Sequence, residues 1–199
     1  MKVIPRHSTL YMAGEVGSAV YLVQRGWLKS CVPTVSGKVP LIDLHTRGEL
    51  VGVPSFSGGR YSDSAVAMTE SFVQVLPFEQ LMAAVRRYDL LPAWTDFLLQ
   101  RLHSQQQTIS DFVTLDSEMR LASRLLRLST RMTTEQDENV PVQLPARLTH
   151  EEIAAMVGTT RSRVGHFLAN FEKKGLIDRS GDVVVVVPAR LRRFLAVVC

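Results

Sequence analysis

The sequence predicts an α+β fold, in which an N-terminal antiparallel β-barrel or jelly roll is followed by a long helix and a C-terminal winged helix-turn-helix. Three observations support this prediction. Short apolar runs alternate with turn residues up to about residue 76, a helical apolar stripe follows, and residues 148–176 have the pattern of two short helices joined by a glycine turn. We expect the domains to span residues 1–91, 92–115 and 116–199.

The N-terminal third is divided into apolar runs by turn-forming segments such as AGEVGS, SGK and SGGRYSD. Regular punctuation of this kind is typical of antiparallel sandwiches and barrels. The predicted strands cover residues 9–12, 19–24, 28–35, 39–44, 50–53 and 64–76. A helix is predicted over residues 78–88, and Pro92 opens a longer one.

The long helix carries a stripe of side chains at alternating spacings of four and three residues, as in the seam of a coiled coil. Two interpretations stay open at this point, because the stripe would suit either a second copy of the chain or the barrel of the same chain. The polar Gln105 favours a dimer, since two such amides can pair across a two-fold axis. The stripe comprises Leu98, Leu102, Gln105, Ile109 and Phe112.

A break is predicted after the long helix, with Asp116 as a new N-cap and Glu118 in the first turn. The next helix has an apolar stripe, and an acidic polar loop over residues 133–139 follows it. The stripe comprises Leu121, Leu125, Leu126 and Leu128.

The segment 148–176 contains start and stop signals for two helices. Thr149 and Glu152 have the spacing of a capping box, Gly158 suits the end of the first helix, and Thr160 can cap the second. The second helix would bury Val164, Phe167, Leu168 and Phe171. Its opposite face then carries Arg161, Ser162, Arg163 and His166 near the N-terminus, the end that enters the major groove in this motif.

The alternative is an ordinary antiparallel helix pair with solvated arginines. That alternative does not explain why cations gather at a helix start, where the helix dipole disfavours them unless phosphates are near.

Residues 176–179 and 183–187 are predicted to form a β-hairpin, or wing, and the second of these strands is expected to be buried on both faces. Pro188 opens a last helix.

Composition narrows the functional class. The chain has 199 residues, a formal net charge of +4 and an excess of basic side chains that is densest in residues 147–199, as expected of a domain that meets a phosphate backbone. Its two cysteines, Cys31 and Cys199, cannot build a disulfide framework. Without a signal peptide or a membrane-spanning run, we expect a cytoplasmic protein with no membrane partner.

Enzymatic chemistry has no support in the sequence. Only His7 and His45 lie in the barrel region, without an H-x-H pair that would suit a metal, and no nucleophile–base arrangement or Gly-rich phosphate loop with its lysine is present. We therefore expect neither an enzyme nor a metal site.

The order of these parts, together with four segments, resembles the Crp/Fnr family of bacterial transcription regulators. The segments are TLYMAGEVGSAVYLVQRG, RGELVG, LDSEMRLASRLLRLS and EEIAAMVGTTRSRVGHFLANFEKKGLI. The resemblance implies a homodimer that binds a two-fold symmetric DNA site, RNA polymerase as a partner, and a small effector in the barrel that repositions the paired reading helices. An alternative function is a ligand sensor that acts mainly through protein contacts, with the acidic loop as a contact surface.

The resemblance also assigns roles at the DNA interface. Arg161 matches the arginine that begins the base-reading face, and it would contact a guanine through two hydrogen bonds while Ser162 and His166 read neighbouring base edges. Ser162 and His166 replace the glutamate and second arginine of the family pattern, so a different half-site is expected. Phosphate contacts are expected from Arg147, Thr149, Thr160 and Arg163.

The effector pocket departs from the pattern of cyclic-nucleotide binders. Those members have a glutamate after the glycine that matches Gly52, and an arginine before a Ser-Ala pair; here Val53 and Asp63 stand in those positions, with Ser64 next. A carboxylate in place of the guanidinium would repel a phosphate by ~4 kcal/mol at 4 Å and an effective dielectric near 20. We therefore expect no cAMP binding of that type, although Arg60 is a possible substitute.

The sequence also lacks features that other effectors of the family would require. The helix positions that would touch a nucleotide base are Gln105 and Gln106 rather than small hydroxyls, and the N-terminal cysteine cluster of oxygen-sensing members is absent. A haem sensor would need an axial ligand, for which His45, Cys31, His7 and methionines are the candidates. No cofactor is predicted, and the effector is left open.

Overall fold

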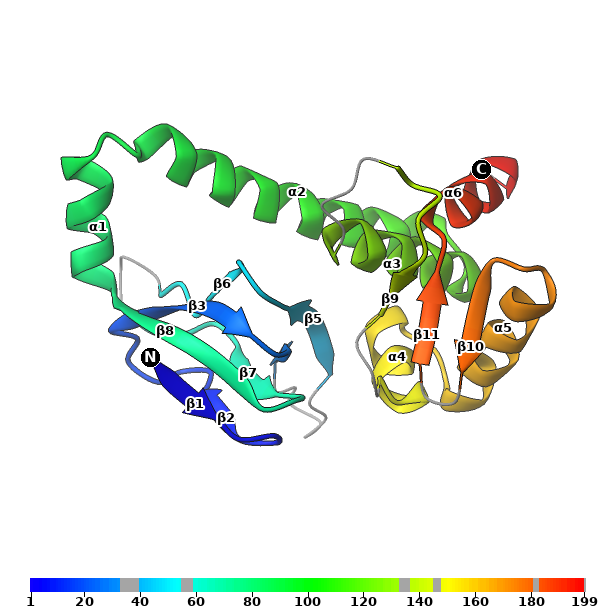
Figure 1. Cartoon of the computed structure of the whole chain (residues 1–199), viewed down its shortest axis with the longest axis horizontal. Helices are drawn as coiled ribbons and strands as arrows, with labels where there is room; N and C mark the ends of the chain where they lie inside the picture. Colours follow the sequence, from blue (N-terminus) through cyan, green and yellow to red (C-terminus); the bar gives the residue numbers. More distant parts are fainter. Residues whose placement is uncertain (33–39, 55–58, 133–136, 145–147, 181–182, 199) are drawn as a thin grey trace. The chain divides into compact units, whose positions relative to one another are not determined.

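The computed structural model describes residues 1–32, 40–54, 59–132, 137–144, 148–180 and 183–198. The chain forms two compact units, an N-terminal unit from Met1 to His103 and a C-terminal unit from Ser104 to Cys199. Helix α2 (Leu91–Thr114) begins in the first unit and ends in the second (Figure 1).

The N-terminal unit contains two four-stranded antiparallel sheets, in the orders β1-β8-β3-β6 and β2-β7-β4-β5. The structure therefore has the jelly-roll form of the expected fold, with two sheets rather than a closed barrel. The strands are β1 (Lys2–Ile4), β2 (Thr9–Tyr11), β3 (Ala19–Arg25), β4 (Leu28–Cys31), β5 (Leu41–His45), β6 (Leu50–Val51), β7 (Ser64–Ala67) and β8 (Ser71–Pro77).

The prediction of one strand over residues 64–76 was wrong. Strand β7 pairs with β2 and β4, whereas β8 pairs with β1 and β3, so the chain crosses between the sheets at residues 68–70. Hydrogen bonds fix this crossing: Met68 N donates to Trp27 O at 2.8 Å, and Trp27 N donates to Thr69 Oγ1 at 3.0 Å. Strand β1 was also missed, although Ile4 in it is buried.

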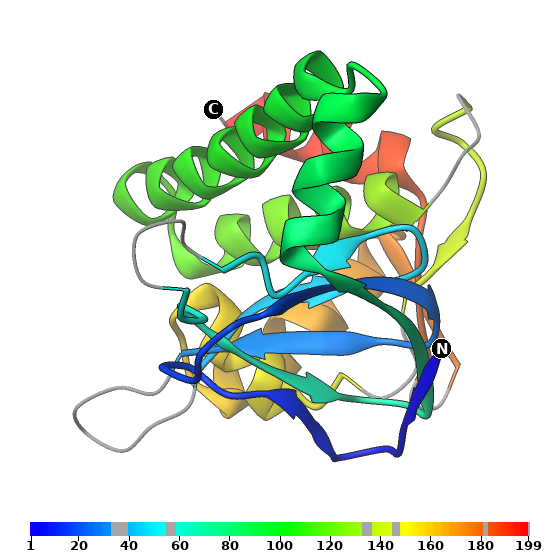
Figure 2. The same cartoon turned by 90° about the vertical axis from the view of Figure 1, so that its left-hand side faces the viewer.

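The core of this unit lies between the two sheets. Alternating side chains point inward from both, as the period of two along a strand requires. The buried cluster comprises Ile4, Leu10, Tyr11, Val23, Leu28, Val51, Tyr61, Ala65, Ala67 and Val73. Helix α1 (Phe78–Arg87) follows directly from β8 (Figure 2). Within the described residues, no helix is long and apolar enough to cross a membrane.

The C-terminal unit contains the end of α2, four further helices and a three-stranded antiparallel sheet in the order β10-β11-β9. Helices α4 and α5 lie against each other, and α5 leads into β10 (Figure 1). The elements are α3 (Ser117–Met132), β9 (Val142–Gln143), α4 (His150–Val157), α5 (Arg161–Lys173), β10 (Ile177–Ser180), β11 (Val183–Val186) and α6 (Pro188–Val198).

The expected break before α3 is present, because Asp116 Oδ1 accepts a hydrogen bond of 2.9 Å from Met119 N as an N-cap does. The hairpin β10-β11 is also confirmed, with Ile177 opposite Val186. The expectation that β11 is buried on both faces was wrong, since only Val186 in it is buried. A sheet only three strands wide, with the short β9 at its edge, leaves part of its central strand accessible to water.

Candidate nucleic-acid interface

The start of α4 is fixed by the predicted capping box. Glu152 N donates to Thr149 Oγ1 at 3.1 Å, and Thr149 N donates to Glu152 Oε2 at 3.0 Å. Each contact satisfies an amide that the first turn of a helix leaves without a partner. Thr149 Oγ1 also donates to Glu152 Oε2 at 3.1 Å, so this hydroxyl is engaged within its own helix.

The turn between α4 and α5 depends on Gly158, which has the left-handed φ of 65° that ends a helix. Thr160 then caps α5, since Thr160 Oγ1 accepts a hydrogen bond from Arg163 N at 3.4 Å. Because Gly158 and Thr160 are two residues apart, α5 starts almost directly after α4 ends. The local signals in the sequence therefore set the geometry of the turn.

Helix α5 has one apolar face and one cationic face. Val164 and Phe171 are fully buried, and Phe167 and Leu168 are buried beside them. The expected reading residues, Arg161, Ser162, Arg163 and His166, are all exposed. The first turn of α5 contains no acidic residue, so the positive end of the helix dipole and the arginines add to one positively charged surface.

Two parts of the expected interface lie outside the described residues. Arg147, an expected phosphate contact, belongs to the segment 145–147, and residues 181–182 come between the two strands of the wing in the sequence. Both strands of the wing are described, and Arg179 Nη1 in β10 lies 4.0 Å from Glu172 Oε2 near the end of α5. The wing therefore follows α5 almost directly in the chain and is attached to its end.

The apolar stripe on α2 is exposed in the single chain. Leu98, Leu102 and Ile109 have 40%, 49% and 64% of their surface exposed, and Gln105 is exposed between them. Phe112, expected at the end of the seam, is 45% exposed, and one edge of its ring lies against Gly158 of its own chain. The neighbouring Val113 is 79% exposed and extends the unpartnered apolar surface.

Arg120 connects the end of α2 to the turn of the helix-turn-helix. Its guanidinium lies 4.9 Å from the centre of the Phe112 ring, Nη1 donates to Leu115 O at 2.7 Å, and Nε donates to Val157 O at 2.8 Å. A cation at the last carbonyls of α4 also suits the negative end of that helix dipole. The sequence analysis missed this residue, because its contact with Val157 joins positions 37 residues apart in the sequence.

Family models and relatives agree with this arrangement. A model of the Crp-like helix-turn-helix domain matches residues 119–194, and a model of the cyclic nucleotide-binding domain matches residues 1–88. The chain is 28% identical over 184 residues to a CRP-like cAMP-activated global transcriptional regulator of Mycobacterium tuberculosis, with 92% of this chain and 81% of the relative covered.

The chain belongs to the Crp/Fnr family of transcription regulators. The regulator is also 25% identical over 189 residues to the fumarate and nitrate reduction regulatory protein of Escherichia coli, which covers 93% of this chain and 74% of the relative. The first of these relatives is named as a transcriptional regulator and the second as a regulatory protein.

Solved structures give the same fold. FixK2 from Bradyrhizobium japonicum has a TM-score of 0.83 at 18% identity and covers 96% of this chain and 94% of its own. A CRP-family transcriptional regulator from Thermus thermophilus has a TM-score of 0.72 at 25% identity, with 98% and 97% covered. The regulator thus shares the order of sensor-like domain, long helix and helix-turn-helix with both.

Four residues of the expected effector pocket lie in the N-terminal unit of the regulator, and three of them contact neighbouring residues of the same unit. Gly52 is buried against Tyr11, Val53 is half-buried, and Asp63 accepts a hydrogen bond of 3.2 Å from the Tyr11 hydroxyl. Ser64 Oγ accepts a hydrogen bond of 2.9 Å from Ala13 N. The other two expected residues, Gln105 and Gln106, are exposed on α2 in the C-terminal unit.

Arg60, considered as a substitute for the phosphate-binding arginine, is also engaged. Its Nη1 donates to Gly14 O at 2.6 Å, and the side chain is exposed. The structure therefore shows Arg60 in contact with the backbone of the loop that follows β2.

His45, a candidate axial ligand for haem, has both ring nitrogens in hydrogen bonds. Nε2 lies 2.9 Å from Ser30 Oγ, and Nδ1 lies 3.2 Å from Glu49 Oε2, with His45 itself 4% exposed. These contacts leave no lone pair directed at a cofactor, so His45 does not fit the role. His7 is exposed and Cys31 is buried.

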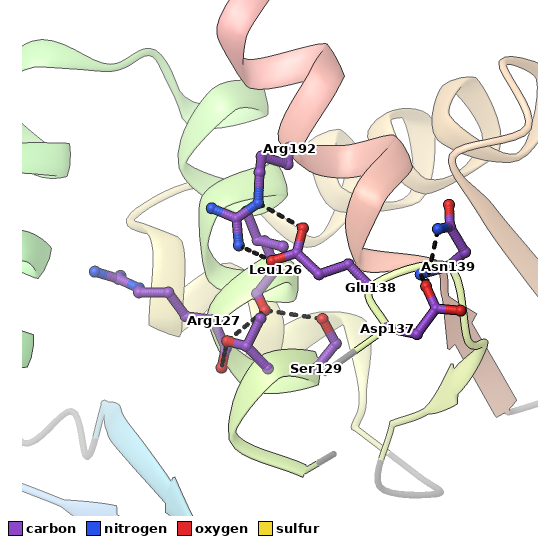
Figure 3. Close-up of polar contacts among 8 residues, drawn as sticks. Leu126, Arg127, Ser129, Asp137, Glu138, Asn139 and Arg192 are labelled. Carbon is purple, nitrogen blue, oxygen red and sulfur yellow. Dashed lines mark hydrogen bonds and ion pairs between the residues drawn. The ribbon is translucent and has the colours of Figure 1, made fainter. Parts of the chain in front are cut away.

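The described part of the acidic loop is attached to α6. Arg192 Nε donates to Glu138 Oε2 at 2.8 Å, and the second carboxylate oxygen accepts from Arg192 Nη2 (Figure 3). This fork-shaped pairing holds the pKa of the Glu138 carboxyl below its usual value, because the hydrogen bonds favour the charged form. Within the described residues, no three His, Cys, Asp or Glu side chains gather as a metal site.

Proposed function

We propose that this regulator binds double-stranded DNA as a homodimer at a two-fold symmetric site, in the cytoplasm. The exposed cationic start of α5 carries the proposal, because it presents Arg161, Ser162 and His166 at the helix end that enters the major groove. The domain boundaries that we propose are residues 1–91, 92–115 and 116–199.

Each interface residue has a proposed role. Arg161 donates two hydrogen bonds to O6 and N7 of a guanine, and Ser162 and His166 read neighbouring base edges. Arg163 contacts phosphate. Its guanidinium packs over the Phe167 ring, 5.4 Å from the ring centre. Thr160 accepts its capping bond through Oγ1, which leaves the hydroxyl proton for a phosphate oxygen.

Thr149 and Arg147 complete the proposed phosphate contacts. The hydroxyl of Thr149 donates to Glu152 in the free chain, so a phosphate contact requires that this proton be redirected. The main role of Thr149 is therefore to fix the residue at which α4 begins.

The dimer places two reading helices on one duplex. The supporting observation is an exposed stripe on α2, which Val113 extends; the stripe comprises Leu98, Leu102, Gln105, Ile109 and Phe112. In a two-stranded coiled coil, each helix buries an apolar stripe of this kind against the other helix. Two α5 helices related by the two-fold axis would then reach successive major grooves about 34 Å apart.

RNA polymerase is the protein partner that we propose. A regulator bound at a promoter acts on transcription through the polymerase, and the Mycobacterium tuberculosis relative is named as a global transcriptional regulator. The ion pair between Glu138 and Arg192 would present the end of the acidic loop in a defined position on the surface. Control by cAMP through a phosphate-binding arginine is not part of the proposal.

Selection of bound sequences from random duplexes tests this function. We expect enrichment of a palindrome, and we expect Arg161→Ala to lose about 1–3 kcal/mol of binding free energy and to relax the preference at one base pair of each half-site. Arg163→Ala should weaken binding to all sequences alike and reduce its salt dependence. Arg86→Ala, in α1, is the matched control. Failure to enrich any two-fold symmetric sequence would contradict the proposal.

A further inference from the structure

Three tyrosine rings fill the space between the two sheets of the N-terminal unit. Tyr11 comes from β2 in one sheet, Tyr21 from β3 in the other, and Tyr61 from the segment before β7. The ring centres of Tyr11 and Tyr61 are 4.2 Å apart, and those of Tyr11 and Tyr21 are 5.7 Å apart. Tyr11 and Tyr61 are only 3% and 5% exposed. We call these three residues the tyrosine cluster.

The backbone of the expected effector pocket lies directly against this cluster. A Cβ added to Gly52 would come within 2.8 Å of Tyr11 Cε1 and 3.1 Å of Tyr21 Cδ2. The space next to Gly52, where the family resemblance places an effector, therefore contains aromatic carbon atoms of the protein itself.

The polar groups around the cluster bond to one another. The Tyr11 hydroxyl donates to Asp63 Oδ1 at 3.2 Å, and the Tyr61 hydroxyl donates to Ala19 O at 2.8 Å. Burial raises the pKa of both hydroxyls above the usual range of tyrosine, so both stay protonated and remain donors at physiological pH. Buried polar groups that have partners carry no desolvation penalty that a ligand would need to relieve.

Helix α2 is attached beside this cluster through Arg101. Arg101 Nη1 donates to Leu50 O at 2.9 Å, two residues before Gly52 in the sequence. The guanidinium also lies 5.8 Å from the ring centre of Phe97 on the same helix. The helix that carries the proposed dimer stripe is thereby fixed to the strand that ends at the tyrosine cluster.

We infer that the tyrosine cluster holds the N-terminal unit in one ligand-free state and that Arg101 fixes α2 to it, so that DNA binding requires no small molecule between the sheets. This inference rests on the proposed DNA-binding function and concerns its regulation. The rings occupy the interior that a ligand would fill, and the bond from Arg101 to Leu50 supplies a contact between helix and strand without one.

The first test uses the purified regulator. We expect calorimetric titration with cAMP and with cGMP to give no saturable heat, and we expect affinity for the selected duplex to be the same with and without either nucleotide. Saturable binding of either nucleotide, or a gain in DNA affinity of about tenfold, would overturn the inference. The calorimetric arm involves no DNA, so it is decided even if the proposed DNA-binding function fails.

The second test compares Arg101→Gln with the control Arg86→Gln, which removes an exposed cation of α1 in the same unit. We expect Arg101→Gln to weaken DNA binding by about tenfold and Arg86→Gln to leave it unchanged. Equal affinities for the two folded variants, checked by circular dichroism, would overturn the role of Arg101.

The third test asks whether the ring volume matters. Tyr61→Ala should weaken DNA binding and create a cavity that phenol fills, with recovery of DNA affinity when phenol is added. Wild-type affinity in Tyr61→Ala, or a loss that phenol does not reverse, would overturn the role of the cluster. If this variant does not fold, Tyr61→Phe applies: it keeps the ring, and we expect its DNA affinity to equal that of the wild type, with a tenfold loss as the contrary result.

Discussion

Gly158 and Phe112 lie so close together that a Cβ on Gly158 would come within 2.7 Å of Phe112 Cε1. The turn of the helix-turn-helix is therefore in direct contact with the end of α2, and Arg120 covers the same ring at 4.9 Å. A side chain at this turn would meet two obstacles, the left-handed φ of 65° and the ring of Phe112.

Gly158→Ala should therefore destabilise the C-terminal unit. The backbone conformation alone costs about 1–3 kcal/mol for a residue with a side chain, and displacement of the ring adds to it. Gly175→Ala is a matched control, because Gly175 has the same φ of 65° and nothing within 4 Å of the added Cβ. Urea unfolding of both variants isolates the effect of the ring. Equal destabilisation by the two substitutions would show that the contact with Phe112 contributes nothing.

Asp111 is a second point of attachment between α2 and α3. This carboxylate is 5% exposed, accepts hydrogen bonds from Gln107 Nε2 at 3.0 Å and Ser123 Oγ at 2.7 Å, and lies 3.2 Å from Arg127 Nη2. Asp111→Ala would leave the partly buried guanidinium without this counter-charge, and we expect a loss of about 2–4 kcal/mol in the free energy of unfolding. Asp96→Ala, an exposed position on the same helix, should change the unfolding midpoint little in the same measurement.

The ion pair between Glu138 and Arg192 predicts a dependence of stability on pH. Because the folded state lowers the pKa of Glu138, the pair stabilises the fold above the usual pKa of glutamate, and this contribution is lost as the pH falls through the lowered value. Glu138→Gln should therefore unfold at a lower temperature than the wild type near neutral pH and at the same temperature in acid. Unfolding temperatures of the wild type and of Glu138→Gln, measured from neutral to acidic pH, test this prediction. The exposed Glu70→Gln is the control. A difference that persists unchanged into acid would contradict this assignment.

The exposed stripe on α2 predicts the state of assembly. Ile109→Asp places a charge at a residue that is 64% exposed in the single chain, so the monomer should fold normally while a dimer formed through α2 dissociates. Sedimentation velocity at micromolar concentration should show a dimer for the wild type and a monomer for the variant. Val3→Asp, an apolar residue 51% exposed on β1, should remain dimeric. A wild-type protein that sediments as a monomer would contradict the proposed dimer.

The local structure of the reading motif followed from the sequence alone. Thr149 with Glu152, Gly158 and Thr160 are cap and turn signals whose partners lie within four residues, and the spacing of Val164, Phe167, Leu168 and Phe171 assigns the buried face of α5. Such signals depend on a single turn of backbone, so they can be recognised without knowledge of the remaining fold. The jelly-roll class and the wing hairpin were predicted for a related reason, because regularly spaced turn residues divide the strands.

Only the tertiary structure decided which distant residues meet. The polar residues Thr69, Glu70 and Ser71 interrupt the run 64–76 between β7 and β8, but they do not indicate that the second strand joins the other sheet. The contact of Phe112 with Gly158 joins residues that no local pattern connects. The tyrosine cluster arises in the same way, because Tyr11, Tyr21 and Tyr61 are brought together only when the two sheets pack. Side-chain contacts across sheets and helices depend on the relative placement of whole elements, and periodicity within one element carries no information about that placement.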